Sequence, residues 1–275
     1  MLYYRIIIAI SFLVPLIYLI NLKQTFPFFL VISGIIILGS LEFCHNLAVK
    51  RRLSPMTIVG VAACLILSLS AYGGNILPET GLPTRVSFVL IGLIFFISLA
   101  GLLRQEISGS MSAIAITLMG VFYVSLPLTY LILLRRLPEG DKYLYFLFLV
   151  AWLSDVFAYT VGSKWGSSRI TPVISPNKTV EGCLGGEVAA IFTAVIGKIF
   201  FIPAMPLWHA LILGFVMGGL AQLGDLIESL FKRDAGVKDS SSWLIGHGGI
   251  LDSFDSLIFT TPTLFYYLVI FNNGQ

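Results

Sequence analysis

Charged residues are scarce in this chain. Asp, Glu, Lys and Arg make up 11% of its 275 residues, whereas 57% of the residues are hydrophobic and the mean hydropathy is +0.94. Soluble domains carry about a quarter of their residues as charged side chains. The composition therefore excludes an ordinary soluble domain and indicates an integral membrane protein.

Cysteine is also rare, and basic residues form no long run. Cys44, Cys64 and Cys183 lie far apart in the sequence, so they form neither a CxxC motif nor a disulfide framework. The net charge of +3 is small. Without a basic run, we expect no nucleic-acid partner.

Long apolar runs are abundant instead. Their length is typical of membrane helices, whereas barrel strands would span about ten residues with alternating polarity. The first run has no small-residue cleavage site, which indicates a retained helix rather than a signal peptide. The sequence thus predicts an all-α integral membrane protein with about nine transmembrane helices. The predicted spans lie near residues 4–21, 26–41, 56–72, 86–103, 111–134, 143–162, 183–203, 207–224 and 256–273.

Acidic residues divide the chain into two parts, because nine of the 14 follow residue 150. An ionisable side chain at membrane depth costs roughly 2.5–3.5 kcal/mol, so it normally faces a partner or a wet cavity. We therefore expect residues 1–142 to form a transmembrane scaffold of about five helices. Residues 143–275 would form a catalytic region of about four helices, with polar loops at 163–182 and 225–255.

The two polar loops are separated by a pair of predicted helices, so they emerge on the same side of the membrane. With nine spans, that side holds eleven of the 17 Lys and Arg residues. The positive-inside rule then places both loops, and a polar cavity between them, on the cytoplasmic side. The predicted location is a bacterial cytoplasmic membrane, with the active site facing the cytoplasm.

Carboxylates gather at the ends of two predicted helices. In GDLIESLFKRD, Asp225, Glu228, Ser229 and Lys232 recur at helical spacing and share one face. Gly236 is expected to end that helix.

The last predicted helix begins in the same way. Asp252 and Asp255 share one face, and the loop GHGG, residues 246–249, precedes them. Its glycines allow tight turns that expose backbone N–H groups to a ligand. Taken singly, each acid could also cap a helix or pair with a cation. Taken together, the two helix ends predict carboxylates that converge on one point.

Oxygen ligands from separate helices suit Mg²⁺, which also takes oxygens from a bound phosphate. The cationic residues Lys232, Arg233, Lys238 and His247 lie close by in the sequence. Acids that could hold a metal beside cations that could hold phosphates predict phosphoryl or nucleotidyl transfer.

The earlier polar loop contains ISPNKTVEG. Ser175 followed by Pro176 predicts an N-cap and first-turn pair, with Lys178 in the first turn of the next helix. The N–H groups of that helix would form an anion site. The spacing excludes a Walker A loop. Upstream, Asp155 and Tyr159 lie at i and i+4 within an apolar span.

As a unit, SLFKRDAGVKDSSSWLIGHGGILDSFD resembles the signature of the phosphatidate cytidylyltransferases, the CDP-diacylglycerol synthases. The segments DVFAYTVG, SPNKTVEG and GDLIES also resemble parts of that family. Two positions depart from its pattern: Ile245 replaces Pro, and Ser253 replaces an Arg beside the predicted metal site. The matching residues are Ser229, Lys232, Arg233, Lys238, Asp239, Leu244, His247, Gly248, Gly249, Asp252 and Asp255.

The resemblance implies transfer of the cytidylyl group of CTP to phosphatidic acid, giving CDP-diacylglycerol and pyrophosphate for phospholipid biosynthesis. The expected cofactor is Mg²⁺, held by Asp225 and Asp252, with room for a second cation. The catalytic residues would be Asp225, Asp252, Asp255, Lys232 and His247. The substrate-binding residues would be Ser175, Lys178, Ser229, Arg233, Lys238, Asp239, Gly248 and Gly249. The expected partners are CTP, phosphatidic acid and membrane lipid, with a homodimer as a further candidate.

Two other functions compete with this interpretation. A CTP-dependent polyprenol or phytol kinase would use a similar site, but it needs a base for the acceptor hydroxyl. An ion-coupled transporter predicts acids near the bilayer midplane and repeated halves. A CDP-alcohol phosphotransferase is disfavoured, because its characteristic arrangement of acids is missing.

Overall fold

The computed structural model describes residues 14–48, 53–73, 84–241 and 248–271. Seven helices among them are long and apolar enough to cross a membrane. The predicted all-α integral membrane fold is thereby confirmed. A helical segment at 14–21 precedes the following elements. They are α2 (Phe26–Leu41), the π-helix η1 (Glu42–Ala48), α3 (Thr57–Gly73), α4 (Thr84–Leu103), α5 (Ser110–Met119), the π-helix η3 (Gly120–Ser125), α6 (Leu126–Arg136), α7 (Gly140–Trp165), the strands β1 (Arg169–Thr171) and β2 (Ser175–Thr179), α8 (Val180–Phe201), α9 (Leu207–Asp234) and α10 (Ile250–Phe271).

The helix ends that carry the acids extend further than hydropathy indicates. α9 continues to Asp234, and α10 begins at Ile250 rather than near residue 256. The prediction that Gly236 ends the preceding helix is confirmed. Gly236 has φ +72°, and Val237 N–H donates to the Lys232 carbonyl at 2.9 Å, as in a Schellman-type C-cap. The predicted acids therefore lie on helical turns and not in loops.

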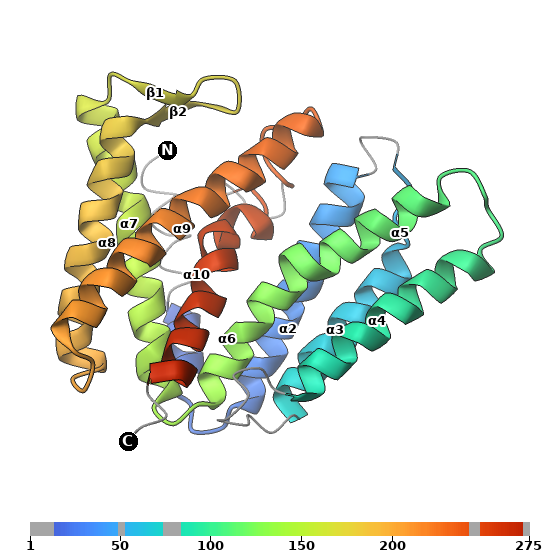
Figure 1. Ribbon diagram of the computed structural model, residues 1–275, viewed down its shortest axis with the longest axis horizontal. Coiled ribbons are helices and arrows are strands. Elements are labelled where there is room, and N and C mark those ends of the chain that lie inside the picture. Colours follow the sequence, from blue (N-terminus) through green and yellow to red (C-terminus); the bar gives the residue numbers. More distant parts are fainter. Residues whose placement is uncertain (1–13, 49–52, 74–83, 242–247, 272–275) are drawn as a thin grey trace.

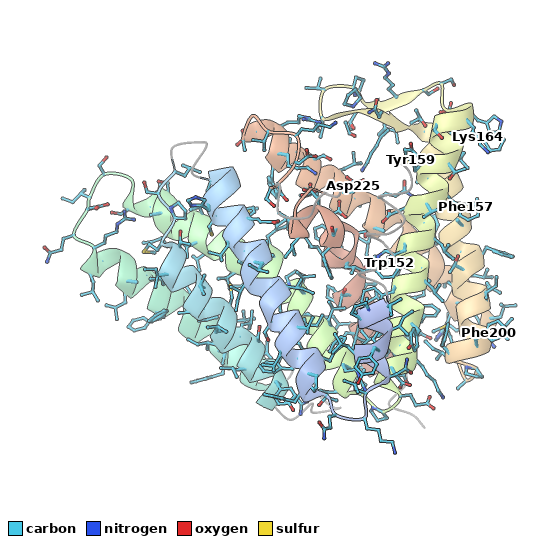
Figure 2. All side chains as sticks on the ribbon, turned by 180° about the vertical axis from the view of Figure 1, so that it is seen from behind. Trp152, Phe157, Tyr159, Lys164, Phe200 and Asp225 are labelled. Atoms are coloured by element: carbon cyan, nitrogen blue, oxygen red, sulfur yellow. The ribbon has the colours of Figure 1, made fainter. Side chains whose placement is uncertain are left out.

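Helices α2–α6 pack beside helices α7–α10 (Figure 1). Helices α7 and α8 form one edge and carry the β1–β2 hairpin at one end, and α9 packs beside them. α10 contacts α9 on one side and α6 and α2 on the other. Asp225 and Tyr159 lie toward the hairpin end of the molecule, whereas Phe200 lies nearer the opposite end (Figure 2). α10 is thus the element that joins the site to the scaffold.

Burial separates core helices from lipid-facing ones. In α6, Leu131, Leu133 and Leu134 are each 0% exposed, because α2, α3, α7 and α10 surround this helix. In α4, by contrast, Phe88 and Phe95 are largely exposed. An exposed apolar surface is the normal state of a helix that faces lipid tails.

Glycines let the C-terminal helices approach closely. A Cβ placed on Gly214 of α9 would lie 2.7 Å from the Ile191 Cα of α8, so glycine permits close packing of these two helices. A Cβ on Gly224 would lie 2.4 Å from the Asp255 carbonyl oxygen of α10. Because Gly224 precedes Asp225, this close approach brings the acids of α9 and α10 together.

Candidate active site

The segment before α8 corrects one prediction. Ser175 is not an N-cap: residues Ser175–Thr179 form strand β2, which pairs with β1 in an antiparallel hairpin. Thr179 caps α8 instead, because its hydroxyl oxygen accepts from Gly182 N–H at 3.2 Å. Pro176 also favours extended backbone at Ser175. Lys178 therefore lies on a strand and not in a helical turn.

The Glu181 carboxylate anchors the segment before the hairpin to α8. Glu181, in the first turn of α8, accepts hydrogen bonds from the Ser167 hydroxyl at 2.6 Å and from the backbone N–H groups of Ser167 and Ser168. These bonds tie the end of α7 to the start of α8. They hold the hairpin over the end of the helix pair.

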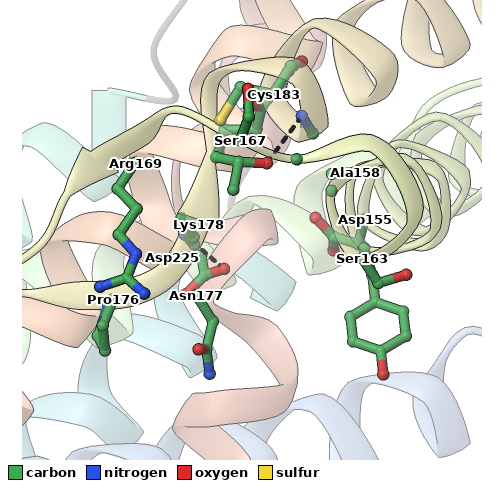
Figure 3. A pocket seen from close by; sticks show the side chains of 16 residues that line it. Asp155, Ala158, Ser163, Ser167, Arg169, Pro176, Asn177, Lys178, Cys183 and Asp225 are labelled. Atoms are coloured by element: carbon green, nitrogen blue, oxygen red, sulfur yellow. Dashed lines mark hydrogen bonds and ion pairs between the residues drawn. The ribbon is translucent and has the colours of Figure 1, made fainter.

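A cavity of about 630 Å³ lies between the hairpin, α7, α8 and α9 (Figure 3). The polar side chains that line it include Asp155, Tyr159, Arg169, Asn177, Lys178, Thr179, Gln222 and Asp225. Four of these residues, Asp155, Tyr159, Lys178 and Asp225, were singled out from the sequence. The N-terminal turn of α8 also borders the cavity at Gly182.

Lys178 and Asp225 join the hairpin to α9 within this cavity. Lys178 Nζ lies 2.6 Å from Asp225 Oδ2, and Figure 3 shows the pair among the lining residues. Ser229 donates to the other Asp225 oxygen, Oδ1, at 3.3 Å. The predicted helical face of α9 is thus confirmed, and it faces the hairpin.

Three carboxylates converge next to this ion pair. One oxygen each of Asp225, Glu228 and Asp255 lies within 4.8 Å of the other two. Asp225 and Glu228 come from α9 and Asp255 from α10, so the predicted convergence of the two helix ends is confirmed. Asp155 on α7 adds a fourth acid nearby, because it forms a side-chain hydrogen bond with Ser256 on α10.

Lys232 bridges the cluster to Asp252. Its Nζ lies 2.7 Å from Glu228 Oε2 and 2.5 Å from Asp252 Oδ1. The lysine side chain is 12% exposed and that of Glu228 is 0% exposed. A cation held this deeply between two acids is fixed in position.

Asp252 also caps α10. Its Oδ2 accepts from Gly249 N–H at 2.7 Å, from Ser240 N–H at 2.9 Å and from the Ser240 hydroxyl at 2.8 Å. An acid in the third helical position that accepts from the N-cap residue is one half of a capping box. Asp252 thus contacts Lys232 and lies beside Glu228, but it is not one of the three clustered acids. Its role as a metal ligand stays a prediction.

The glycine loop is shaped around this cap. Gly248 has φ +80°, and a Cβ there would lie 2.5 Å from Asp252 Oδ2. The Gly249 N–H is donated to Asp252 rather than left for a ligand, and the Ser253 hydroxyl donates to the Gly249 carbonyl. The substrate-binding roles of both glycines stay predictions. Leu244, Ile245 and His247 lie outside the described residues.

The remaining predicted residues lie at the rim. Arg233 Nε donates to the Ile174 carbonyl at 3.0 Å, so it ties the hairpin turn to the end of α9. Lys238 and Asp239 are exposed in the turn after α9. No described contact tests the predicted phosphate-binding role of these residues or of Ser175.

Sequence motifs did not indicate some of the residues that line or support the site. Arg169 and Asn177 enter the cavity because the β-hairpin folds back, whereas the sequence predicts a polar loop at Arg169 and the first turn of a helix at Asn177. Glu228 shares a face with Asp225 and Lys232, and that spacing could have identified it as a ligand. Glu42 in the scaffold gave no local signal.

The donors present fit a divalent cation. All three clustered side chains offer carboxylate oxygens, the ligands that Mg²⁺ prefers. Glu228 Oε1 is buried and has no hydrogen-bond partner among the residues that the structure describes. A buried carboxylate oxygen without a donor is costly, so a cation at this point would stabilise it. The cluster is therefore a group that could hold a metal ion.

Fold and site together define a multi-pass helical membrane enzyme that holds carboxylates and lysines at one end of its bundle. The chain belongs to the cytidylyltransferase family, whose model matches residues 3–271. It is 38% identical over 224 residues to the phosphatidate cytidylyltransferase of Staphylococcus saprophyticus, which covers 82% of this chain and 83% of the relative. It is 33% identical over 240 residues to that of Staphylococcus aureus, covering 87% and 89% respectively.

Proposed function

We propose that this protein transfers the cytidylyl group of CTP to phosphatidate, giving CDP-diacylglycerol and pyrophosphate. Family membership and relatives named for this activity support the reaction. One structural observation carries the proposal. A cluster of three carboxylates is flanked by Lys178 and Lys232 and borders a cavity lined by further polar groups.

The cluster of Asp225, Glu228 and Asp255 is the proposed site for Mg²⁺. When bound there, Mg²⁺ would neutralise charge on phosphate oxygens as pyrophosphate leaves. Among the described residues, five acids lie at this site, including Asp155 and Asp252, and two lysines form ion pairs with them. This imbalance favours binding of positive charge.

The lysines would bind the phosphates. Lys178, on the hairpin, is proposed to hold the phosphate of phosphatidate, supported by Arg169. Lys232 would stabilise the triphosphate from the other side, with Arg233 and Lys238 at the rim. Ser175, Ser229, Asp239 and the glycine loop with His247 would complete the substrate contacts.

No protein nucleophile is required. A phosphate oxygen of phosphatidate attacks the α-phosphorus of CTP, a new P–O–P bridge forms, and the bond to the β-phosphate breaks. Because the attacking group is already an anion, the protein contributes alignment and charge neutralisation. A site at one end of the bundle allows the lipid to arrive from the bilayer and CTP from the cytoplasm.

The test follows both products in one assay. Purified protein in detergent is mixed with CTP, phosphatidate and Mg²⁺, and pyrophosphate and CDP-lipid are measured together. We expect equal amounts from wild type and at least about tenfold less from Glu228→Gln. Glu106→Gln serves as the matched control, because Glu106 is an exposed scaffold carboxylate that pairs with Arg104.

The same assay separates the competing kinase. With a polyprenol or phytol as acceptor, a phosphorylated prenol formed without pyrophosphate would favour the CTP-dependent lipid kinase. If wild type forms no CDP-lipid while folded by thermal melt, the proposed reaction is wrong.

A further inference from the structure

Glu42 is a buried acid in the scaffold, at the first residue of the π-helix η1. Its exposed fraction is 0%, yet no lysine or arginine forms an ion pair with it among the described residues. π-helical turns are rare and occur frequently at functional sites. The cost of burying this side chain therefore needs a compensating interaction.

The first backbone N–H groups of α10 provide that interaction. Glu42 Oε1 accepts from Ile250 N–H at 2.9 Å, and Oε2 accepts from Leu251 N–H at 2.8 Å. These are the first two residues of α10, whose N–H groups have no partner within the helix. A carboxylate at a helix N-terminus is also favoured by the helix dipole. Glu42 thus binds the helix that carries Asp252 and Asp255.

Two serines fill the remaining acceptor positions. The Ser241 hydroxyl donates to Glu42 Oε1 at 2.6 Å, and the Ser240 hydroxyl lies 3.1 Å from Glu42 Oε2. Glu42 therefore accepts from Ile250, Leu251 and Ser241, and the single proton of the Ser240 hydroxyl can be donated to either Glu42 Oε2 or Asp252 Oδ2. An amide could not match it, because in either orientation its NH₂ group would face the backbone N–H of Ile250 or Leu251, which can only donate.

Ser240 connects Glu42 to the active site. Ser240 also contacts Asp252 Oδ2 through its hydroxyl at 2.8 Å and its N–H at 2.9 Å, and Asp252 Oδ1 holds Lys232 at 2.5 Å. Gly249 passes through the middle of this arrangement. A Cβ there would lie 2.0 Å from Ser240 Oγ and 2.5 Å from Glu42 Oε2. Only glycine allows the scaffold acid to reach the loop.

We propose that Glu42 is a positioning residue, which fixes Lys232 in the cytidylyl-transfer site through Ser240 and Asp252. The inference rests on the proposed function and assigns part of the active site to the N-terminal scaffold. Glu42 does not line the cavity. It therefore acts on the reaction only through residues that do.

A purely structural cap would lower stability without a specific kinetic signature. A positioning role predicts a lower kcat with little change in KM for either substrate, because phosphate contacts at the cavity persist. It also predicts that Glu42 and Ser240 affect kcat through the same chain of contacts. The losses from Glu42→Gln and Ser240→Ala should then be less than additive in a double-mutant cycle.

The experiment measures kcat and both KM values for Glu42→Gln, Ser240→Ala and the double variant in the purified, Mg²⁺-loaded protein. We expect Glu42→Gln to lower kcat by about 10- to 100-fold, as outer-sphere partners of active-site ligands do. Ser240→Ala, which keeps the buried acid and has the milder effect on folding, should lower kcat in the same direction. Ser40→Ala is the control, because Ser40 is buried in α2 but bonds only Ser125 and Cys64.

Hydrogen exchange at the backbone amides of residues 248–251 provides a readout that needs no reaction. We expect faster exchange in Glu42→Gln and unchanged exchange in Ser40→Ala. Wild type that forms no CDP-lipid would count against the proposed reaction. Active wild type with additive losses, or an unaltered kcat in a folded Glu42→Gln protein, would overturn the role of Glu42 alone.

Discussion

At the residue scale, the acids of the site differ in the lysines with which they form ion pairs. Asp225 holds Lys178 of the hairpin, and Asp252 and Glu228 share Lys232. Asp255 has its Oδ1 on the N–H of Ser256 and otherwise faces the cluster. The acids thus divide into two kinds. Asp225, Glu228 and Asp255 could hold a metal ion, whereas Asp252 binds a lysine and caps a helix.

This division predicts different consequences for two similar substitutions. Glu228→Gln removes a charge from the cluster, so we expect the apparent Mg²⁺ affinity to fall by about tenfold or more. Asp252→Asn keeps all three clustered acids but removes one of the two carboxylates that hold Lys232, so we expect kcat to fall with the Mg²⁺ dependence little changed. The measurement is CDP-lipid formation as a function of Mg²⁺ concentration at saturating CTP.

The predicted metal role of Asp252 is tested by the same titration. If Asp252→Asn shifts the Mg²⁺ dependence as strongly as Glu228→Gln does, Asp252 is a ligand and Lys232 must move away when the metal binds. A thermal melt of each variant distinguishes either result from unfolding.

At the element scale, small residues decide how close the acids come. The α9 helix touches α10 at Gly224, one residue before Asp225, and it touches α8 at Gly214. The hairpin is placed by Glu181 at its base and by Arg233 at its turn. The site therefore depends on backbone contacts between three helices and one hairpin.

Gly224→Ala tests the contact between α9 and α10. The added Cβ would lie 2.4 Å from the Asp255 carbonyl oxygen, so the helices must separate. Overpacking of this kind costs about 1–3 kcal/mol, and we expect a lower melting temperature. Activity should fall further than unfolding explains, because Asp225 and Asp255 move apart.

Gly219→Ala is the matched control on the same helix. Its Cβ would meet only Glu187 Oε2, at an ordinary contact distance of 3.8 Å. Alanine is favoured over glycine in a helix by about 1 kcal/mol, so this variant should be as stable as wild type or more stable. Equal effects of the two substitutions would contradict the role of close packing at Gly224.

At the scale of the whole molecule, the sequence predicts most of the fold, because hydropathy reports directly on membrane helices. Helical spacing also predicted that the acids of α9 share a face. It could not predict the β-hairpin, because Ser175 and Pro176 are equally compatible with a helix start and an extended segment. Nor could it predict Glu42, whose partners Ile250 and Leu251 lie in a distant part of the chain.

The two ends of the helix bundle differ, and this difference matters for the orientation of the protein in the membrane. The hairpin lies at one end and the turn between α6 and α7 at the other (Figure 1), and Asp225 lies toward the hairpin end (Figure 2). At that second end, Arg135 and Arg136 donate to the carbonyls of Leu22 and Ala71. These arginines satisfy helix ends that would otherwise lack donors.

Orientation in the membrane can be tested with single cysteines after Cys44, Cys64 and Cys183 are replaced by alanine. Val173 in the hairpin is 89% exposed, and Glu139 in the turn before α7 has a side chain that is 54% exposed. The positive-inside rule places the hairpin in the cytoplasm. In intact cells, we expect an impermeant maleimide to label Glu139→Cys at once and Val173→Cys only after the membrane is opened. The reverse pattern would place the acids outside the cell, where CTP is not supplied, and the predicted cytoplasmic active site would be wrong.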